Sequence, residues 1–444
     1  MKYVEGARRL FLETGTRFPR ELIWSVALIK HASASTNHSL GKLDDAAYRA
    51  ISGASKEVMD GKHDERVTVD VFQTGSGTGI NMNVNELIAE VASASSGLKI
   101  HANDHVNMGQ SSNDVVPTAI RMGAVSLAAR KLNPSINLSI RSLQALAEST
   151  STVYKAGRTH LRDAMPVTLG QEFQAYADAF SHDRRLIQVA LDYVKELPIG
   201  GTAVGTGVNT DPLFGARVVA EVNRTTKLGF REASNRFRAM RLLSDLVALS
   251  SALRVTALDT HRLCQDLRLM FSGPLTGLGE VDIPTQAEVA GSSIMPGKTN
   301  PVTVEASLLA CAQVVGLDQA NQMAGTLGEF ELSMGVPLIG YNVNLQVRLL
   351  SEALHKLSVN VIEGIVPDKK RLKRYAESSP SLITVLSPTI GYDRATAVGK
   401  KISQSYSIRE ALKELGYADA EVDRFLDLKK LVRPSGQVKA RRKK

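Results

Sequence analysis

One short loop places two serines, a lysine and an asparagine close together. Residues 291–301 read Gly-Ser-Ser-Ile-Met-Pro-Gly-Lys-Thr-Asn-Pro, and Glu305 follows in the opening turns of an expected helix. Helix capping and loop mobility explain the glycines, Asn300 and the final proline. They do not explain why Ser292 lies so near the fixed positive charge of Lys298. The segment therefore indicates a flexible lid that acts on an anion.

Hydroxyl groups also gather in the loop Gln73-Thr-Gly-Ser-Gly-Thr-Gly79. Its small residues let backbone N–H groups approach an anion, and Ser76 and Thr78 add hydroxyl donors. No Gly-Lys-Ser/Thr follows, so this is not a Walker loop, and no strand precedes it in a βαβ unit, as a dinucleotide fingerprint requires. A flexible turn is the alternative interpretation.

Two histidines lie four residues apart in His101-Ala-Asn-Asp-His105. A metal site is one interpretation of this spacing. No third ligand follows at a recognisable spacing, and Asn103-Asp104 is typical of a turn. The sequence therefore predicts no metal here.

Two further polar segments precede helical patterns. Ser111-Ser-Asn-Asp114 contains Ser112 and Asn113, and it either caps a helix with Pro117 in its first turn or presents helix N–H groups to a carboxylate. His160 lies in a turn-rich loop before a helix. Because imidazole exchanges protons near neutral pH, His160 is a candidate general acid or base, with a structural histidine as the alternative.

The elements that position these loops are expected to be long helices. Glycine and proline are absent from residues 171–197, 230–272 and 341–363. Apolar residues repeat at helical spacing, as in Leu242, Leu246, Leu249 and Leu253. The pattern predicts a mainly α fold with a bundle of long helices. Apolar stripes on more than one side of such helices favour an oligomer.

Composition restricts the class of protein. Of the 444 residues, 43% are hydrophobic and 22% are charged, as in globular proteins, and no apolar run is long enough to span a bilayer. Two cysteines and an amino end without an apolar block favour a cytoplasmic location. The net charge is +9, but five positive charges lie in the basic tail, residues 439–444. A solvated tail of this kind argues against nucleic-acid recognition.

Taken together and in their order along the chain, the polar segments at residues 73–86, 101–114, 157–172 and 291–305 resemble those of the fumarase/aspartase superfamily. The resemblance runs from about Pro19 to about Leu428 and includes residues 200–207 and 388–393. It implies a homotetramer around a core of about twenty helices, with each active site built from loops of three subunits. It also implies three domains: an N-terminal helical domain (1–112), a central long-helix bundle (113–368) and a small C-terminal helical domain with the basic tail (369–444).

Within the superfamily, the chain most resembles class II fumarases. His160 in Gly-Arg-Thr-His, Gly297 before the lysine, and Asn-Asp-His-Val at residues 103–106 are fumarase-like. Gly79-Ile80 and Met108-Gly109 depart from that pattern, and the amino end is short. The resemblance implies reversible hydration of fumarate to (S)-malate through an aci-carboxylate intermediate, without a metal or an organic cofactor.

The resemblance also assigns roles to the loop residues. It makes Ser292 the general base and His160, oriented by Glu305, the group that protonates the departing hydroxide. Lys298 and Asn300 stabilise the aci-carboxylate. The expected substrate-binding residues are Ser76, Thr78, Ser111, Ser112, Asn113, Thr159, Lys298 and Asn300. A second anion site is expected at His101, Asn103 and Asp104.

Other functions remain open on the sequence alone. An aspartate ammonia-lyase shares the scaffold, the base and the aci-carboxylate, and differs in the leaving group. Lyases that release fumarate from argininosuccinate or adenylosuccinate fit the loops less well. A non-enzymatic helical oligomer, or an RNA-associated protein that uses the basic tail, leaves the cluster of Ser292, Lys298 and Asn300 unexplained.

Overall fold

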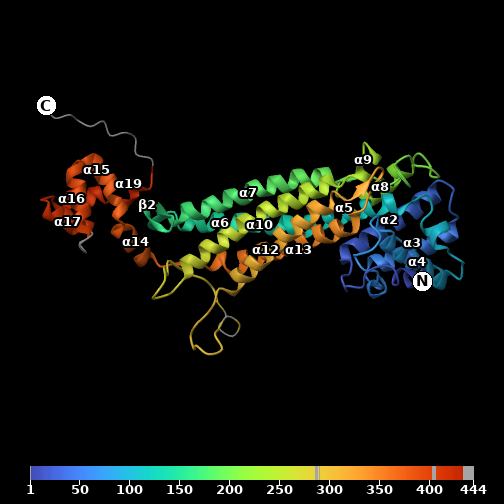
Figure 1. The fold of residues 1–444 in the computed structure, drawn as a ribbon, viewed down its shortest axis with the longest axis horizontal. Coiled ribbons are helices and arrows are strands. Elements are labelled where there is room, and N and C mark those ends of the chain that lie inside the picture. The colour runs from blue at the N-terminus through green and yellow to red at the C-terminus, as the bar shows by residue number, and fades with distance from the viewer. Residues whose placement is uncertain (1, 286–288, 290, 403–406, 434–444) are drawn as a thin grey trace. The chain divides into compact units, whose positions relative to one another are not determined.

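The computed structural model describes residues 2–285, 289, 291–402 and 407–433. Its helices are α1 (Lys2–Ala7), α2 (Arg20–Ser39), α3 (Asp45–Met59), α4 (Thr78–Ser96), α5 (Ser112–Leu127), α6 (Asn133–Ser149), α7 (Leu169–Val194), α8 (Phe214–Thr226), α9 (Arg236–Arg241), α10 (Ser244–Phe271), α12 (Val302–Ala324), α13 (Val336–Asn360), α14 (Lys369–Ser378), α15 (Ile383–Ile390), α16 (Tyr392–Ile402), α17 (Ile408–Glu414), α18 (Asp419–Phe425) and α19 (Leu428–Leu431). The mainly α fold predicted from the sequence is therefore confirmed (Figure 1).

Strands and short helical turns link these helices. The strands are β1 (Tyr154–Thr159), β2 (Arg162–Thr168), β3 (Glu196–Leu197), β4 (Arg231–Glu232), β5 (Val281–Asp282), β6 (Gly328–Glu329), β7 (Leu332–Ser333) and β8 (Val366–Pro367). They pair as β1–β2, β3–β4, β5–β8 and β6–β7, of which β3–β4 is parallel. Short turns are η1 (Asp64–Arg66), η2 (Ala102–Val106), η3 (Ala128–Leu132), η4 (Ile362–Gly364) and η5 (Pro380–Leu382). In the part of the chain that the structure describes, only the strands of the β1–β2 hairpin are longer than two residues.

The chain divides into two compact units. Unit 1 comprises residues 1–136, 182–260 and 309–353, and unit 2 comprises residues 137–181, 261–308 and 354–444. Several boundaries fall inside long helices, because α7, α10, α12 and α13 each contribute residues to both units.

In unit 1, α2 is the most enclosed of the N-terminal helices. It packs against α3, α5 and α8, and small or apolar residues on most of its sides allow this close approach. Residues Val26 to Ile29 are fully buried. Lys30 and His31 follow directly within the same buried stretch.

Polar contacts fix how α10, α12 and α13 meet within unit 1. Asp318 on α12 accepts hydrogen bonds from Ser250 Oγ at 2.7 Å and Arg254 Nε at 2.8 Å on α10. Asn321 Nδ2 on α12 donates to Gln346 Oε1 on α13 at 3.1 Å. Because buried polar atoms need partners, these contacts specify one alignment of the three helices.

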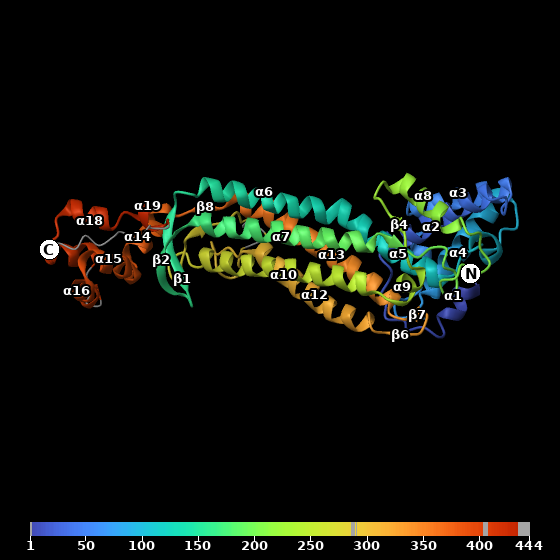
Figure 2. The ribbon, with the colours of Figure 1, turned by 90° about the horizontal axis from the view of Figure 1, so that it is seen from above.

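The same long helices meet different neighbours in unit 2. The long helices α6, α7, α10 and α13 run alongside one another (Figure 2). In unit 2, Ser139 Oγ on α6 lies 2.8 Å from Ser358 Oγ on α13, and Tyr176 on α7 donates to Asp266 on α10 at 2.5 Å. The C-terminal helices α15–α18 enclose a separate apolar cluster of their own, which includes Leu382, Leu386 and Val398.

The structure corrects two details of the helix boundaries. The expected caps of α5 were Ser112, Asn113 or Asp114, but the N-cap is Ser111, and Pro117 is the sixth helical residue. The long run 230–272 is not one helix, because Leu242 is extended between α9 and α10. Among the described residues, no helix combines the length and the hydropathy needed to cross a membrane.

Candidate functional site

Three hydroxyl groups, each from a polar segment singled out in the sequence, meet in unit 1. Ser76 Oγ lies 2.8 Å from Thr78 Oγ1, which lies 2.8 Å from Ser112 Oγ. Thr78 is the first residue of α4, and Ser112 is the first residue of α5. Two helix N-termini therefore converge on these hydroxyls, and the positive ends of the two helix dipoles favour a bound carboxylate.

The start of α5 is held by a buried carboxylate. Asp114 Oδ1 accepts the backbone N–H of Ser111 at 2.9 Å, and Oδ2 accepts those of Gly200 and Thr202 at 3.0 and 2.9 Å. Burial raises the pKa of Asp114 to about 6, against the opposing effect of these hydrogen bonds. The neighbouring Asn113 Nδ2 donates to Ala203 O at 2.9 Å.

The departure from the fumarase pattern at Gly79-Ile80 has a steric explanation. A side chain at Gly79 would overlap Gln73 and Phe11, which occupy the space beside this residue. Gln73 Oε1 also accepts the backbone N–H of Ile80 at 3.0 Å. The N-terminal segment thus packs beside the loop that carries Thr78.

The expected second anion site forms an exposed turn in unit 1. His101 Nδ1 lies 3.0 Å from Asp104 Oδ2 and also accepts the backbone N–H of Asp104 at 3.2 Å. The side chains of His101, Asn103 and Asp104 are exposed. Their use as an anion site stays a prediction. The described residues contain no group of three or more His, Cys, Asp or Glu side chains suited to a metal ion.

In unit 2, the loop that carries Ser292 folds back on itself. Ser292 Oγ accepts the backbone N–H groups of Ile294 at 3.3 Å and Met295 at 3.1 Å. The backbone N–H of Ser292 donates to Lys298 O at 3.0 Å. Two N–H groups aimed at one hydroxyl oxygen stabilise negative charge on that oxygen.

The other predicted residues of this loop do not join Ser292 through their side chains. The side chain of Lys298 is exposed, and in the described part of the chain its ammonium group makes no hydrogen bond to Ser292. Asn300 lies just before α12, and Glu305 is the fourth residue of that helix. Asn300 contributes its backbone O, which accepts the N–H of Val302 at 2.9 Å.

His160 and Thr159 lie at the turn of the β1–β2 hairpin. His160 and Leu161 have left-handed φ angles of 54° and 58°, and both side chains are exposed. No hydrogen bond or ion pair joins His160 to Glu305 among the residues that the structure describes. A cavity of about 770 Å³ in unit 2 is nevertheless lined by Leu161, Pro301 and Glu305, so the turn and the start of α12 share it.

A buried cluster of charges anchors the hairpin. Glu280, which is fully buried, pairs with Arg158 at 2.7 Å and with Lys155 at 2.8 Å, both on β1. Lys155 also donates to Glu172 on α7 at 2.8 Å, and burial raises the pKa of Glu172. Arg158 directly precedes Thr159, so the cluster fixes the strand just before the turn.

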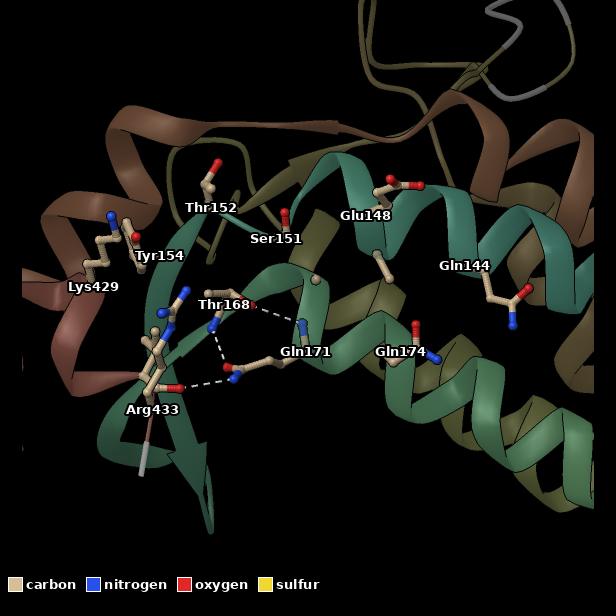
Figure 3. Close-up of a pocket in the computed structure, with 13 residues that line it drawn as sticks. Gln144, Glu148, Ser151, Thr152, Tyr154, Thr168, Gln171, Gln174, Lys429 and Arg433 are labelled. Carbon is tan, nitrogen blue, oxygen red and sulfur yellow. Dashed lines mark hydrogen bonds between the residues drawn. The ribbon is translucent and has the colours of Figure 1, made fainter. Parts of the chain in front are cut away.

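A second cavity in unit 2, of about 630 Å³, contains none of the predicted site residues (Figure 3). Its lining includes Glu148, Gln171 and Lys429. Gln171 Nε2 donates to Val432 O at 3.1 Å, which ties the start of α7 to the segment after α19.

Sequence reasoning missed Lys30, a buried residue that contacts the segments carrying the hydroxyl cluster. Lys30 Nζ donates to Asn81 Oδ1 at 2.7 Å and to Asn107 Oδ1 and Gln110 Oε1, both at 2.9 Å. A signal was present, because Lys30 continues the apolar spacing of Ile23 and Val26 on α2. A lysine on a core-facing stripe is rarely fully buried without a function.

Comparison with known proteins places the chain among lyases. The lyase family model matches residues 2–316, and the model described as fumarase C C-terminus matches residues 382–433. The chain is 62% identical over 434 residues to the class II fumarate hydratase of Saccharolobus solfataricus, covering 98% of this chain and 99% of that protein. It is 45% identical over 401 residues to that of Corynebacterium glutamicum, covering 90% and 84%.

Solved structures agree with this placement. The class II fumarase of Schistosoma mansoni matches with a TM-score of 0.92 and 33% identity, covering 98% of this chain and 95% of that chain. The fumarate lyase:delta crystallin of Brucella melitensis, bound to cobalt, matches with a TM-score of 0.92 and 35% identity, covering 97% and 95%.

Proposed function

This chain belongs to the lyase family of class II fumarate hydratases, and we propose that Ser292 is the base in its reversible conversion of fumarate and water to (S)-malate. The observation that carries this assignment is the pair of N–H groups, from Ile294 and Met295, aimed at Ser292 Oγ. A serine hydroxyl is too weak an acid to supply a base unless its alkoxide is stabilised. Two oriented dipoles give that stabilisation before substrate arrives.

The difficult step is removal of a proton from the carbon next to a carboxylate. In the direction from malate, Ser292 takes that proton and the electron pair moves into the carboxylate, which becomes an aci-carboxylate. The carbon–oxygen bond then breaks and the hydroxyl leaves as water after protonation. Lys298 and Asn300, in the same loop, supply the positive charge and the donor that stabilise the aci-carboxylate.

We assign protonation of the leaving hydroxyl to His160, with Glu305 orienting the imidazole. Support comes from the cavity that the hairpin turn and the start of α12 share. The apo chain carries no direct contact between the two side chains, and such contacts commonly tighten when substrate binds. The reverse reaction uses the same imidazole to activate water.

The hydroxyl cluster of unit 1 is assigned to binding the substrate carboxylates. The residues assigned to this role are its three members Ser76, Thr78 and Ser112, the adjoining Ser111 and Asn113, and Thr159 of the hairpin. The converging starts of α4 and α5 support this role. We assign the exposed turn at His101, Asn103 and Asp104 to a second, non-catalytic dicarboxylate site.

The assembly is proposed to be a homotetramer in which three subunits complete each active site. Exposed apolar side chains on long helices support it, among them Val189 and Tyr193 on α7 and Leu309 and Met323 on α12. Cys264 and Cys311 are both buried and, among the described residues, neither forms a disulfide, which is compatible with a cytoplasmic location.

A side-by-side assay tests the function. Purified protein is mixed with (S)-malate or with L-aspartate, and the absorbance of the fumarate double bond is followed. We expect fumarate from malate and none from aspartate. Release of fumarate from aspartate alone would assign the chain to the ammonia-lyases, and inertness toward both would contradict the proposed function.

A further inference from the structure

Lys30 is a buried cation that the mechanism above does not use. Its side chain is fully enclosed within unit 1, in the middle of α2. Its three hydrogen-bond acceptors are the neutral amide oxygens of Asn81, Asn107 and Gln110. Within the described residues, no carboxylate forms an ion pair with it. The fold therefore encloses a positive charge without neutralising it by direct contact.

The acceptors place this charge beneath the hydroxyl cluster. Asn81 lies one turn after Thr78 on α4, and Gln110 directly precedes Ser111, the N-cap of α5. Thr78 and Ser112 are themselves in contact. Lys30 thus contacts the two segments whose helix starts form the proposed carboxylate site.

A second buried lysine shows the contrast. Lys155, in unit 2, is also almost fully buried, but it lies 2.8 Å from both Glu172 and Glu280. Lys155 is thus paired directly with carboxylates, and Lys30 is not. Enclosing an ammonium group among neutral acceptors is energetically costly, which is a common feature of groups retained for function.

The hydrogen-bond partners of Lys30 come from α4 and from the loop before α5. Among the described residues, Asp114 on α5 is the titratable group whose charge acts on Lys30 through space. Burial lowers the pKa of Lys30 to about 7, while the charge of Asp114 opposes that change. Three backbone N–H groups already occupy the Asp114 carboxylate. These N–H dipoles partly offset the negative charge of Asp114, so that charge does not fully neutralise Lys30.

We propose that Lys30 is a positioning residue that fits this site to a doubly charged ligand: its ammonium group supplies positive potential beneath the starts of α4 and α5, without touching the dicarboxylate. The proposal rests on the proposed function, because it concerns the same carboxylate site. A dianion bound near Lys30 stabilises its protonated amine. Binding near neutral pH is therefore accompanied by uptake of a proton by Lys30 or Asp114. A monoanion gains about half as much from the same charge.

Two saturated ligands distinguish an effect of the Lys30 charge on binding from an effect of side-chain packing around Lys30. Succinate is a dianion near neutral pH, and its monoamide, succinamate, has the same length with one negative charge. Their Kd values are measured by calorimetry for the wild type, Lys30→Gln, Lys30→Met and Lys42→Met. Lys42 is an exposed lysine just after α2, so its replacement is a matched loss of surface charge.

We expect Lys30→Gln and Lys30→Met to weaken succinate binding by about tenfold and succinamate binding by about threefold. Lys42→Met should change both by less than about twofold, because solvent screens an exposed charge. Equal losses for both probes would mean that Lys30 is merely structural, and unchanged succinate binding would also overturn the proposal. If the wild type binds neither probe, the proposed function itself fails.

Proton uptake is measured on protein that retains Lys30, so this test can be made even if the Lys30 variants fold poorly. Succinate is titrated at pH 7.5 in buffers of different ionisation enthalpy, using His160→Asn to remove the imidazole that was assigned above to proton transfer. We expect a net uptake of a fraction of a proton for each succinate bound, because a dianion raises the pKa values of both Lys30 and Asp114. Binding without uptake would contradict the proposal.

Discussion

The hydroxyl of Ser292 already lies in the electrostatic environment that a base requires. The sequence predicted the importance of this serine from the glycine-rich loop and the nearby Lys298. In the structure, the backbone N–H groups of Ile294 and Met295 make the contacts, and the Lys298 side chain is exposed. Sequence patterns identify side chains, whereas the direction of a backbone N–H depends on the loop conformation. That is why the donors were not individually predicted.

Replacing Ser292 by alanine removes the proposed base and leaves the loop backbone intact. We expect Ser292→Ala to lower kcat for malate at least about 100-fold, with KM changed by less than about threefold. The adjacent Ser293 is exposed and serves as the matched control. Ser293→Ala should retain nearly full turnover. Near wild-type kcat in Ser292→Ala would show that another group removes the proton.

The residues that support the site were harder to predict than the residues within it. Ser76, Thr78 and Ser112 were all identified from polar loops, and the structure brings their hydroxyls together. Lys30 was not assigned a supporting role, because it directly follows the apolar run Val26–Ile29, and Asp114 was considered only as part of a helix cap. Their meaning depends on contacts between segments more than fifty residues apart, which spacing along one helix does not reveal.

At the level of elements, long helices were predictable and short strands were not. Long runs without glycine or proline predict α7 and α13, and apolar spacing within such a run predicts α10, since each turn repeats the same signal. The β1–β2 hairpin carries His160 at a turn with two left-handed residues, Leu161 being the other. No glycine marks that turn, so its sequence gave no hairpin signal. Buried charges hold it instead.

Glu280 links the hairpin to the rest of unit 2, and its neutralisation should misplace the turn. We expect Glu280→Gln to lower kcat about 10- to 100-fold, because Arg158 loses its carboxylate one residue before Thr159. Glu172→Gln is the matched control, since Lys155 keeps Glu280 as its partner, and kcat should stay within about threefold.

Kinetics and thermal unfolding together separate positioning from stability in these variants. A positioning role predicts that kcat falls at temperatures where Glu280→Gln is fully folded, and that Glu280→Asp restores part of the activity. If Glu280→Gln lowers Tm but leaves kcat of the folded enzyme unchanged, Glu280 contributes to stability alone.

For the whole molecule, the family and the mainly α class followed from the sequence, and the comparisons confirm both. The division into three domains stays a prediction, and the basic tail at residues 439–444 lies outside the described residues. The proposed hydroxyl cluster belongs to unit 1, whereas Ser292 and His160 belong to unit 2. Quaternary assembly is not encoded in any single loop, so the source of each group in a complete site needs an experiment on mixed oligomers.

Mixed tetramers test whether different subunits supply Ser292 and His160 to one site. Ser292→Ala and His160→Asn are each expected to be nearly inactive alone. The two variants are co-expressed with different affinity tags, and the mixed species is purified. A site is then functional only if its serine comes from a His160→Asn subunit and its imidazole from a Ser292→Ala subunit. Random assembly of shared sites then restores about a quarter of the wild-type activity. If one subunit supplied both groups, every site would lack one of them, and the mixture would remain as inactive as its parents.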